Sequence, residues 1–161
     1  MINIRRAKND ENNILTEISF ASKHYWNYPE EYFEIWRDEL TISQSYINEN
    51  RVFVVEYKER VIGYFSIIEV KEDFWAGKVF VKQGFWLEHI FIVPDYIKKG
   101  IGSKLIKFAT KYCKENNIGL LNIFSDPNAK GFYEKIGAKY ISEYESSIEN
   151  RTVFLYEYAI I

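Results

Sequence analysis

Two glycines separated by one residue join an apolar run to a helical pattern in the middle of this chain. They are Gly100 and Gly102, within the segment VPDYIKKGIGSKLIKF of residues 93–108. Before them, GFWLEHIFIV has the composition of a strand that Pro94 ends. After them, apolar residues recur on one face of a helix up to about Asn116. A strand, a glycine turn and a helix in this order predict an α/β fold.

The other segments predict a mixed central β-sheet with helices on both faces. The expected elements are a strand at INIRRA, helices at about 11–21 and 29–40, strands RVFVVEY and RVIGYFSIIEV joined by a Lys58-Glu59 turn, a strand LLNIF, a helix of about ten residues from Pro127, and final strands at about 139–144 and 152–158. Asp126 can cap the late helix and Gly137 can end it. No repeat or linker interrupts the pattern, so we expect one domain over residues 1–161.

Composition excludes several classes of protein. Hydrophobic residues make up 47% and the formal charge is −2, which is the profile of a soluble globular protein without the basic face of a nucleic-acid binder. The single cysteine, Cys113, excludes an internal disulfide and a cysteine-based zinc site; its apolar helical position favours a buried side chain. No metal site is predicted. The N-terminus has no signal-peptide pattern and no apolar run reaches membrane-spanning length, so we expect a cytoplasmic protein that does not bind membranes.

The glycine turn is a candidate site for a phosphate group. Helix N-termini carry unpaired N–H donors and partial positive charge, and glycines let an anion approach them. Lys98, Lys99 and Lys104 add full charges. A P-loop needs other spacing, and a dinucleotide fingerprint needs a third glycine where Leu105 stands. A tight turn without a ligand remains the alternative.

The segment IVPDYIKKGIG resembles the acyl-CoA loop of the GNAT acyltransferase superfamily. That loop reads Arg/Gln-x-x-Gly-x-Gly/Ala after a strand ending in Val-x-Pro or Ile-x-Pro, and Ile92, Pro94, Gly100 and Gly102 match it. Ile97 stands where the family usually has Arg or Gln. The resemblance implies a GNAT fold, acetyl-CoA as co-substrate and coenzyme A binding. The residues that it implies for this site are Lys98, Lys99, Gly100, Ile101, Gly102 and Ser103.

A second motif lies one helix and one strand further on. DPNAKGFYEKIGA supplies Asn128, Phe132, Tyr133, Glu134 and Gly137 at the family's spacing. The resemblance covers residues 51–154. The N-terminal ASKHYWNYPEEYFEIWRDELTIS is similar to a segment of small bacterial GNAT proteins that contain Ser-Lys-x-x-Trp-x-Tyr.

The resemblance implies direct attack of an amine on a thioester. It assigns contacts with the pantetheine arm and the carbonyl to main-chain groups of Ile90, Phe91 and Ile92, and further cofactor contacts to Asn128 and Tyr133. We expect Tyr133 to act as general acid, by hydrogen bonding with partial proton transfer, because a free phenol is less acidic than a thiol.

The catalytic base has two candidates on adjacent positions of one strand. Glu88 and His89 point to opposite faces, and we rank Glu88 first. The alternative for Glu88 is a buried carboxylate with a partner. For His89 a satisfied core position is the preferred interpretation. The N-terminal aromatic residues are candidates for the acceptor side, although helical spacing also fits a packed core; they are His24, Tyr25, Trp26, Tyr28, Tyr32, Phe33 and Trp36.

The sequence thus predicts an acetyl-CoA-dependent N-acetyltransferase acting on a primary amine of a small molecule or peptide. A non-catalytic acyl-CoA-binding sensor or regulatory module is the alternative, and a nucleotide-binding protein is disfavoured by the spacing of the glycines. A homodimer is compatible with the aromatic content. The acceptor, the acyl chain and the oligomeric state do not follow from the sequence.

Overall fold

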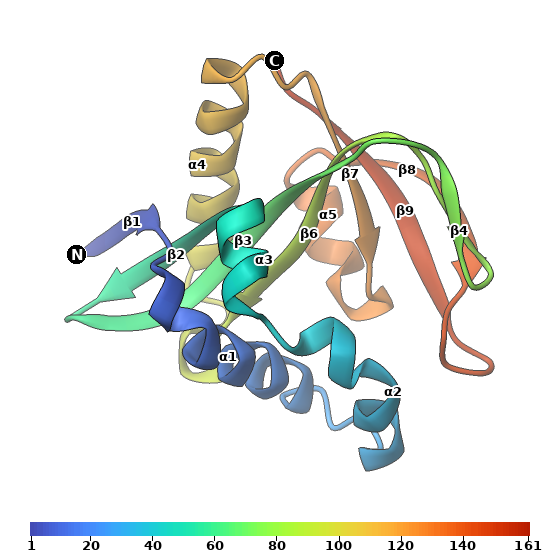
Figure 1. Cartoon of the computed structure of the whole chain (residues 1–161), viewed down its shortest axis with the longest axis horizontal. Helices are drawn as coiled ribbons and strands as arrows, with labels where there is room; N and C mark the ends of the chain where they lie inside the picture. Colours follow the sequence, from blue (N-terminus) through green and yellow to red (C-terminus); the bar gives the residue numbers. More distant parts are fainter. The chain divides into compact units, whose positions relative to one another are not determined.

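The computed structural model describes residues 1–161 and contains a seven-stranded mixed sheet with helices (Figure 1). The elements in chain order are β1 (Ile2–Arg6), η1 (Asn9–Glu11), α1 (Asn12–His24), α2 (Glu30–Leu40), α3 (Gln44–Glu49), β2 (Arg51–Tyr57), β3 (Arg60–Val70), β4 (Phe74–Ala76), β5 (Val79–Val81), β6 (Gly84–Ile92), η2 (Pro94–Tyr96), α4 (Ile101–Glu115), β7 (Leu120–Ser125), η3 (Pro127–Ala129), α5 (Lys130–Lys135), β8 (Lys139–Glu145) and β9 (Thr152–Ala159). The strand order in the sheet is β1-β2-β3-β6-β7-β9-β8. The pairing of β6 with β7 is parallel, whereas β1–β2, β2–β3, β7–β9 and β8–β9 are antiparallel.

Contacts divide the chain into two compact units. The first contains residues 1–67 and 89–108, and the second contains 68–88 and 109–161. Strands β3 and β6 and helix α4 contribute residues to both. The expectation of one domain over the whole chain stays a prediction. No helix is both long and apolar enough to cross a membrane.

Helices cover both faces of the sheet within the first unit. Consecutive strand residues point to opposite faces. Tyr64 of β3 meets α1, where its hydroxyl lies 2.6 Å from the Ser19 hydroxyl. The next residue, Phe65, packs against Phe108 of α4 with ring centroids 6.3 Å apart. The predicted two-sided sheet is therefore confirmed here.

Local sequence signals explain several elements of the first unit. Lys58 and Glu59 have φ values of 51° and 64°, so the predicted two-residue turn joins β2 to β3 with both residues left-handed. Arg5 of β1 donates to Glu11 at 2.8 Å and to Glu56 at 2.9 Å, which ties the first strand to its neighbours. Helix α3 was not predicted; Ser43 caps it by accepting a bond from the Tyr46 N–H at 3.0 Å.

In the second unit, β7 and β9 form long antiparallel pairs, and β8 completes the edge (red in Figure 1). The small β4–β5 hairpin is a further element that the sequence pattern did not reveal. The predicted ten-residue helix after Pro127 is shorter than expected, because its first turn is the 3-10 helix η3 and α5 has six residues. Cys113 is fully buried, as predicted.

Candidate functional site

The end of β6 and the loop after it form the first part of the candidate site. The Val93 N–H donates to the Ile62 carbonyl at 2.8 Å, which holds the end of β6 beside β3. Pro94 then opens η2, and the Ile97 N–H closes it by donating to the Pro94 carbonyl at 3.2 Å. The Ile97 N–H is therefore already bonded within the loop. Position 97 also lacks the Arg or Gln side chain that is usual in the family.

Two left-handed residues redirect the backbone from the loop into α4. Lys98 has φ 64° and Gly100 has φ 80°. The glycine adopts this conformation without steric penalty, whereas the lysine bears some strain. The first bond of the following helix is donated by the Lys104 N–H to the Gly100 carbonyl. Helix α4 has no acidic residue in its first turn, so its positive end is not neutralised.

The lysines of this loop have different surroundings. Lys98, Lys99 and Lys104 are exposed. The Lys99 ammonium lies 5.7 Å from the centroid of the Tyr96 ring, and its side chain lines a cavity of the first unit. Gly102 and Ser103 follow in the first turn of α4, while Ile101 is buried beneath them.

The main chain at Phe91 and Ile92 passes close to Gly63 of β3. A Cβ atom added at Gly63 would lie 2.8 Å from the Phe91 carbonyl oxygen and 3.2 Å from a Val55 methyl group. Sequence analysis did not single out Gly63, although a lone glycine inside a strand of branched residues often indicates such an approach. Only glycine allows β3 to sit this close to Phe91.

The second unit holds Tyr133 of α5. Asp126 caps η3 as predicted, since its Oδ1 accepts the Asn128 N–H at 2.9 Å. Asn128 is exposed, and Gly137 ends the segment with φ 90°, as its sequence position indicated. These signals fix the turn on which Tyr133 is presented.

Tyr133 is buried, with 5% of its surface exposed. Its ring centroid lies 5.6 Å from that of Tyr156 on β9. Burial raises the pKa of Tyr133, and the nearby Asp126 and Tyr156 raise it further. The phenol therefore keeps its proton at neutral pH. Tyr156, which sequence analysis did not identify, is buried and its hydroxyl has no hydrogen-bond partner.

Glu88 and His89 differ sharply in burial. The Glu88 side chain is exposed, so a charged carboxylate bears no large desolvation cost there. His89 is 5% exposed; its ring stacks on Phe91 at 5.6 Å and lies 6.2 Å from Tyr64. Burial, with the positive charge of Lys23, lowers the pKa of His89 to about 4. This environment agrees with the preferred interpretation of His89 as a core residue.

The N-terminal aromatic residues form a packed cluster on α1 and α2. Phe33 and Trp36 are buried, and His24 stacks on Phe33 with centroids 3.8 Å apart. Tyr25 and Trp26 are exposed at the end of α1. The Lys23 ammonium lies 4.5 Å from the Trp36 ring and 5.8 Å from the Tyr28 ring. The Tyr28 and Trp36 rings therefore already make cation–π contacts with Lys23.

Comparison with known proteins identifies the family. The model of the acetyltransferase (GNAT) family matches residues 18–138. The chain belongs to the GNAT acetyltransferase family. This match supports the general class of acyltransferase; the bacterial subgroup suggested by the N-terminal segment stays a prediction. No curated protein matches the chain in sequence.

Solved structures agree with this fold over the whole chain. PaiA N-acetyltransferase from Thermoplasma acidophilum, in complex with coenzyme A, has 21% identity and a TM-score of 0.74, with 99% of each chain covered. A probable acetyltransferase from Staphylococcus epidermidis has 21% identity and a TM-score of 0.72 over 100% of each chain. A GNAT acetyltransferase from Staphylococcus aureus has 18% identity and a TM-score of 0.69, also over 100% of both.

Proposed function

We propose that this chain is an acetyl-CoA-dependent N-acetyltransferase that acts on a primary amine of a small molecule or peptide. The observation that carries the proposal is the loop from Pro94 to Ser103, where left-handed Lys98 and Gly100 turn the chain into a helix without acidic residues in its first turn. Family membership supports acyl transfer, and the coenzyme A bound in the PaiA structure supports the choice of a coenzyme A thioester.

The loop supplies the binding groups in this proposal. The N–H groups from Lys98 to Ser103, together with the Lys98 and Lys99 ammonium groups, bind the pyrophosphate. Ile101 contributes through its main chain, because its side chain is buried. Main-chain groups of Ile90, Phe91 and Ile92 bind the pantetheine arm and the thioester carbonyl. Asn128 completes the set of cofactor contacts.

The reaction forms a C–N bond and breaks the C–S bond of the thioester. Glu88, directly or through a water molecule, takes a proton from the acceptor ammonium, and the free amine attacks the carbonyl carbon. As the C–S bond breaks, the attacking nitrogen gives up its extra proton, through water, to the departing thiolate, and Tyr133 donates a hydrogen bond to that thiolate. Because its pKa is raised, the phenol is a poor source of a full proton, and stabilisation by hydrogen bonding fits its environment better. Burial of the ring makes each such bond stronger than in water.

Replacement of Tyr133 by phenylalanine tests the catalytic assignment. We expect Tyr133→Phe to lower turnover at least tenfold, about 1.4 kcal/mol in the transition state, with acetyl-CoA affinity changed little. Thiol release with a panel of amines gives turnover, and calorimetric titration gives affinity. Tyr140→Phe is the matched control, since Tyr140 is an exposed tyrosine of the same unit. Equal turnover of wild type and Tyr133→Phe would remove Tyr133 from the mechanism.

The second candidate is an acyl-CoA-binding module without turnover. Ile97 favours it, because this position lacks the usual Arg or Gln and its N–H already donates to Pro94. Micromolar binding of acetyl-CoA, with ATP as a negative control, combined with no thiol release for any amine, would establish the binding module. Absence of acetyl-CoA binding would overturn both candidates.

A further inference from the structure

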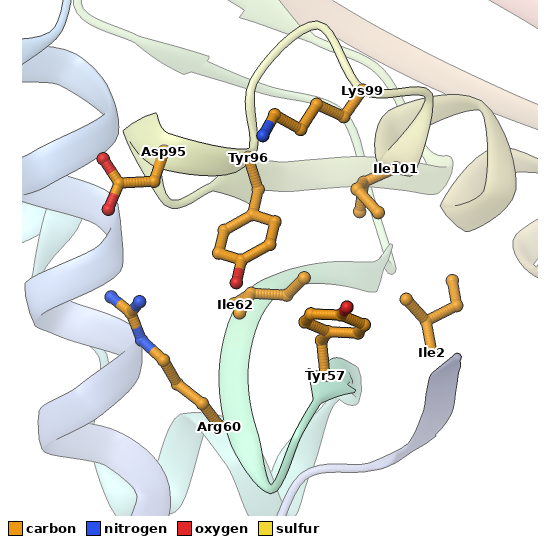
Figure 2. A pocket seen from close by; sticks show the side chains of 8 residues that line it. All are labelled: Ile2, Tyr57, Arg60, Ile62, Asp95, Tyr96, Lys99 and Ile101. Carbon is orange, nitrogen blue, oxygen red and sulfur yellow. The ribbon is translucent and has the colours of Figure 1, made fainter.

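A cavity of about 450 Å³ lies in the first unit, beside the turn between β2 and β3 and the loop after β6 (Figure 2). All the residues that line it belong to the first unit, and neither Tyr133 nor Asn128 is among them. Its volume falls in the range of pockets that hold small organic molecules. Lys99 and Ile101 also belong to the proposed pyrophosphate loop, but no role assigned above involves Tyr57, Arg60 or Ile62.

The inner surface of the cavity is apolar. Ile62 of β3 is fully buried, and Ile101 at the start of α4 is nearly so. Ile2 of β1 adds a third aliphatic side chain (Figure 2). This floor favours a ligand with a hydrophobic body over a bare inorganic ion.

Two tyrosines form the wall. Tyr57 and Tyr96 are half-buried and meet edge to face, with ring centroids 5.8 Å apart. Because the rings touch each other, a flat ligand packs against them from the open side of the cavity and does not slip between them. Their edge-to-face arrangement is the one that aromatic neighbours prefer.

Cations outnumber anions around the opening. The Arg60 side chain lines the cavity with its guanidinium on the same side as Asp95, and it forms no ion pair or side-chain hydrogen bond (Figure 2). Lys99 reaches in from the loop over Tyr96, and the Lys58 ammonium lies 5.3 Å from the Tyr57 ring. Asp95 is the one carboxylate among the lining residues. A guanidinium with open donors is suited to a planar carboxylate or to a phosphate oxygen pair.

We propose that this cavity binds a small organic anion whose aromatic or other flat apolar body packs on Tyr57, Tyr96 and the isoleucine floor, while Arg60 and Lys99 hold its acidic group. The ligand's carboxylate or phosphate faces the Arg60 guanidinium and the Lys99 ammonium. The site shares Lys99 with the proposed pyrophosphate loop, whereas Tyr57, Arg60 and Ile62 have no role in the proposed acetyl transfer.

Binding of benzoate and phenyl phosphate, followed by amide NMR shifts, tests the proposal. We expect saturable shifts confined to Ile2 and its neighbours and to residues 57–62 and 95–101, with benzyl alcohol and benzylamine at least tenfold weaker. Arg60→Gln and Lys99→Gln each weaken benzoate at least fivefold. Lys114→Gln removes one positive charge from an exposed position outside the cavity and leaves the affinity within twofold. Added salt weakens benzoate but not benzyl alcohol.

Three outcomes overturn the proposal. The first is equal binding of benzoate and benzyl alcohol, and the second is an equal loss of affinity in Lys114→Gln and Arg60→Gln. The third is stoichiometric displacement of benzoate by acetyl-CoA together with acetyl-CoA-induced shifts at Tyr57 and Ile62, which would assign the cavity to the co-substrate. If acetyl-CoA fails to bind at all while benzoate behaves as expected, the proposed acetyl transfer falls and the anion site stands.

Discussion

Two titratable rings, His89 in the first unit and Tyr133 in the second, are buried to a similar degree. Both side chains are 5% exposed and both pack among aromatic rings. Burial favours the neutral form of each, so it lowers the pKa of His89 to about 4 and raises that of Tyr133. At pH 7 both rings are uncharged, but the chemical result is different. The phenol keeps a donatable hydrogen, whereas the imidazole resists gaining a second one.

The comparison shows that the cost of burial depends on the ordinary pKa of the group. A free histidine titrates near 6.5, so burial of His89 affects stability within the mildly acidic range. A free tyrosine titrates near 10, so burial of Tyr133 affects stability only in strong base. Burial of Tyr133 therefore adds no pH-dependent loss of stability near neutral pH, whereas burial of His89 does so as the pH falls below about 6.5.

The largest expected effect is a loss of folding stability at mildly acidic pH that comes from His89 and not from Tyr133. His89 is neutral in the folded state down to about pH 4 but gains a proton below about pH 6.5 when unfolded. Its contribution to stability is thus complete above pH 6.5 and declines as the pH falls, by about 1.4 kcal/mol per unit and about 3 kcal/mol in total. Urea unfolding of wild type and His89→Phe between pH 7 and 5 measures this slope, which we expect to flatten in the variant.

The exposed His24 provides the control for that measurement, since it is the only other histidine. His24→Gln should retain the wild-type slope. If His24→Gln flattened the slope and His89→Phe did not, the assignment of the acid sensitivity to His89 would be wrong.

A second effect contrasts the backbone of the two units. Gly63→Ala in the first unit places a methyl group 2.8 Å from the Phe91 carbonyl, and we expect a loss of about 1–3 kcal/mol of stability. Gly131→Ala in α5 meets no atom within 4 Å and should add about 0.5–1 kcal/mol through helix propensity. Thermal and urea unfolding give both values. If both variants were destabilised, or both stabilised, the expected difference between Gly63 and Gly131 would be wrong.

The same pair of variants sharpens the proposed role of the main chain at Phe91. Displacement of its carbonyl in Gly63→Ala should weaken acetyl-CoA at least threefold in calorimetric titration, whereas Gly131→Ala should leave the affinity within twofold. An unaffected affinity in Gly63→Ala would separate the close approach of β3 from co-substrate binding.

The smallest expected effect concerns Asp126 beneath Tyr133. Asp126→Ala removes the Oδ1 that accepts the Asn128 N–H, at a cost of about 1 kcal/mol of stability. It also removes a negative charge that raises the pKa of Tyr133, so that pKa should fall. Asp126→Asn retains an oxygen for the cap but, like Asp126→Ala, loses the charge and the ion pair with Arg151 at 3.6 Å. Titration of the Tyr133 ring by carbon NMR should therefore show a lower pKa in both variants, with the larger loss of stability in Asp126→Ala.

Much of the fold could be predicted from sequence because its signals are local. The apolar face of α4, the Lys58-Glu59 turn, the Asp126 cap and the Gly137 terminus each depend on a few neighbouring residues, and all appear in the structure. Helix α3 escaped prediction because six residues give too little periodicity to recognise. The β4–β5 hairpin pairs only three residues on each side.

The parts of the site that sequence could not supply arise from contacts between distant segments. The close approach at Gly63 depends on where β6 lies beside β3, and the pKa shift of Tyr133 depends on burial and on Tyr156, which is 23 positions further along the chain. The cavity at Arg60 brings together residues from β1, the β2–β3 turn and the loop after β6. The periodicity of apolar residues along the chain does not indicate such tertiary contacts.

The burial of Cys113 has a practical consequence for spectroscopy. Because the chain's single thiol is inaccessible, a disulfide reagent used to follow thiol release reacts with the product and not with the folded enzyme. For the same reason, an introduced surface cysteine can be labelled without first removing the native cysteine. One new surface cysteine in each unit, such as Arg37→Cys and Lys111→Cys, accepts a dye pair whose energy transfer would report the distance between the units in solution, with and without ligands.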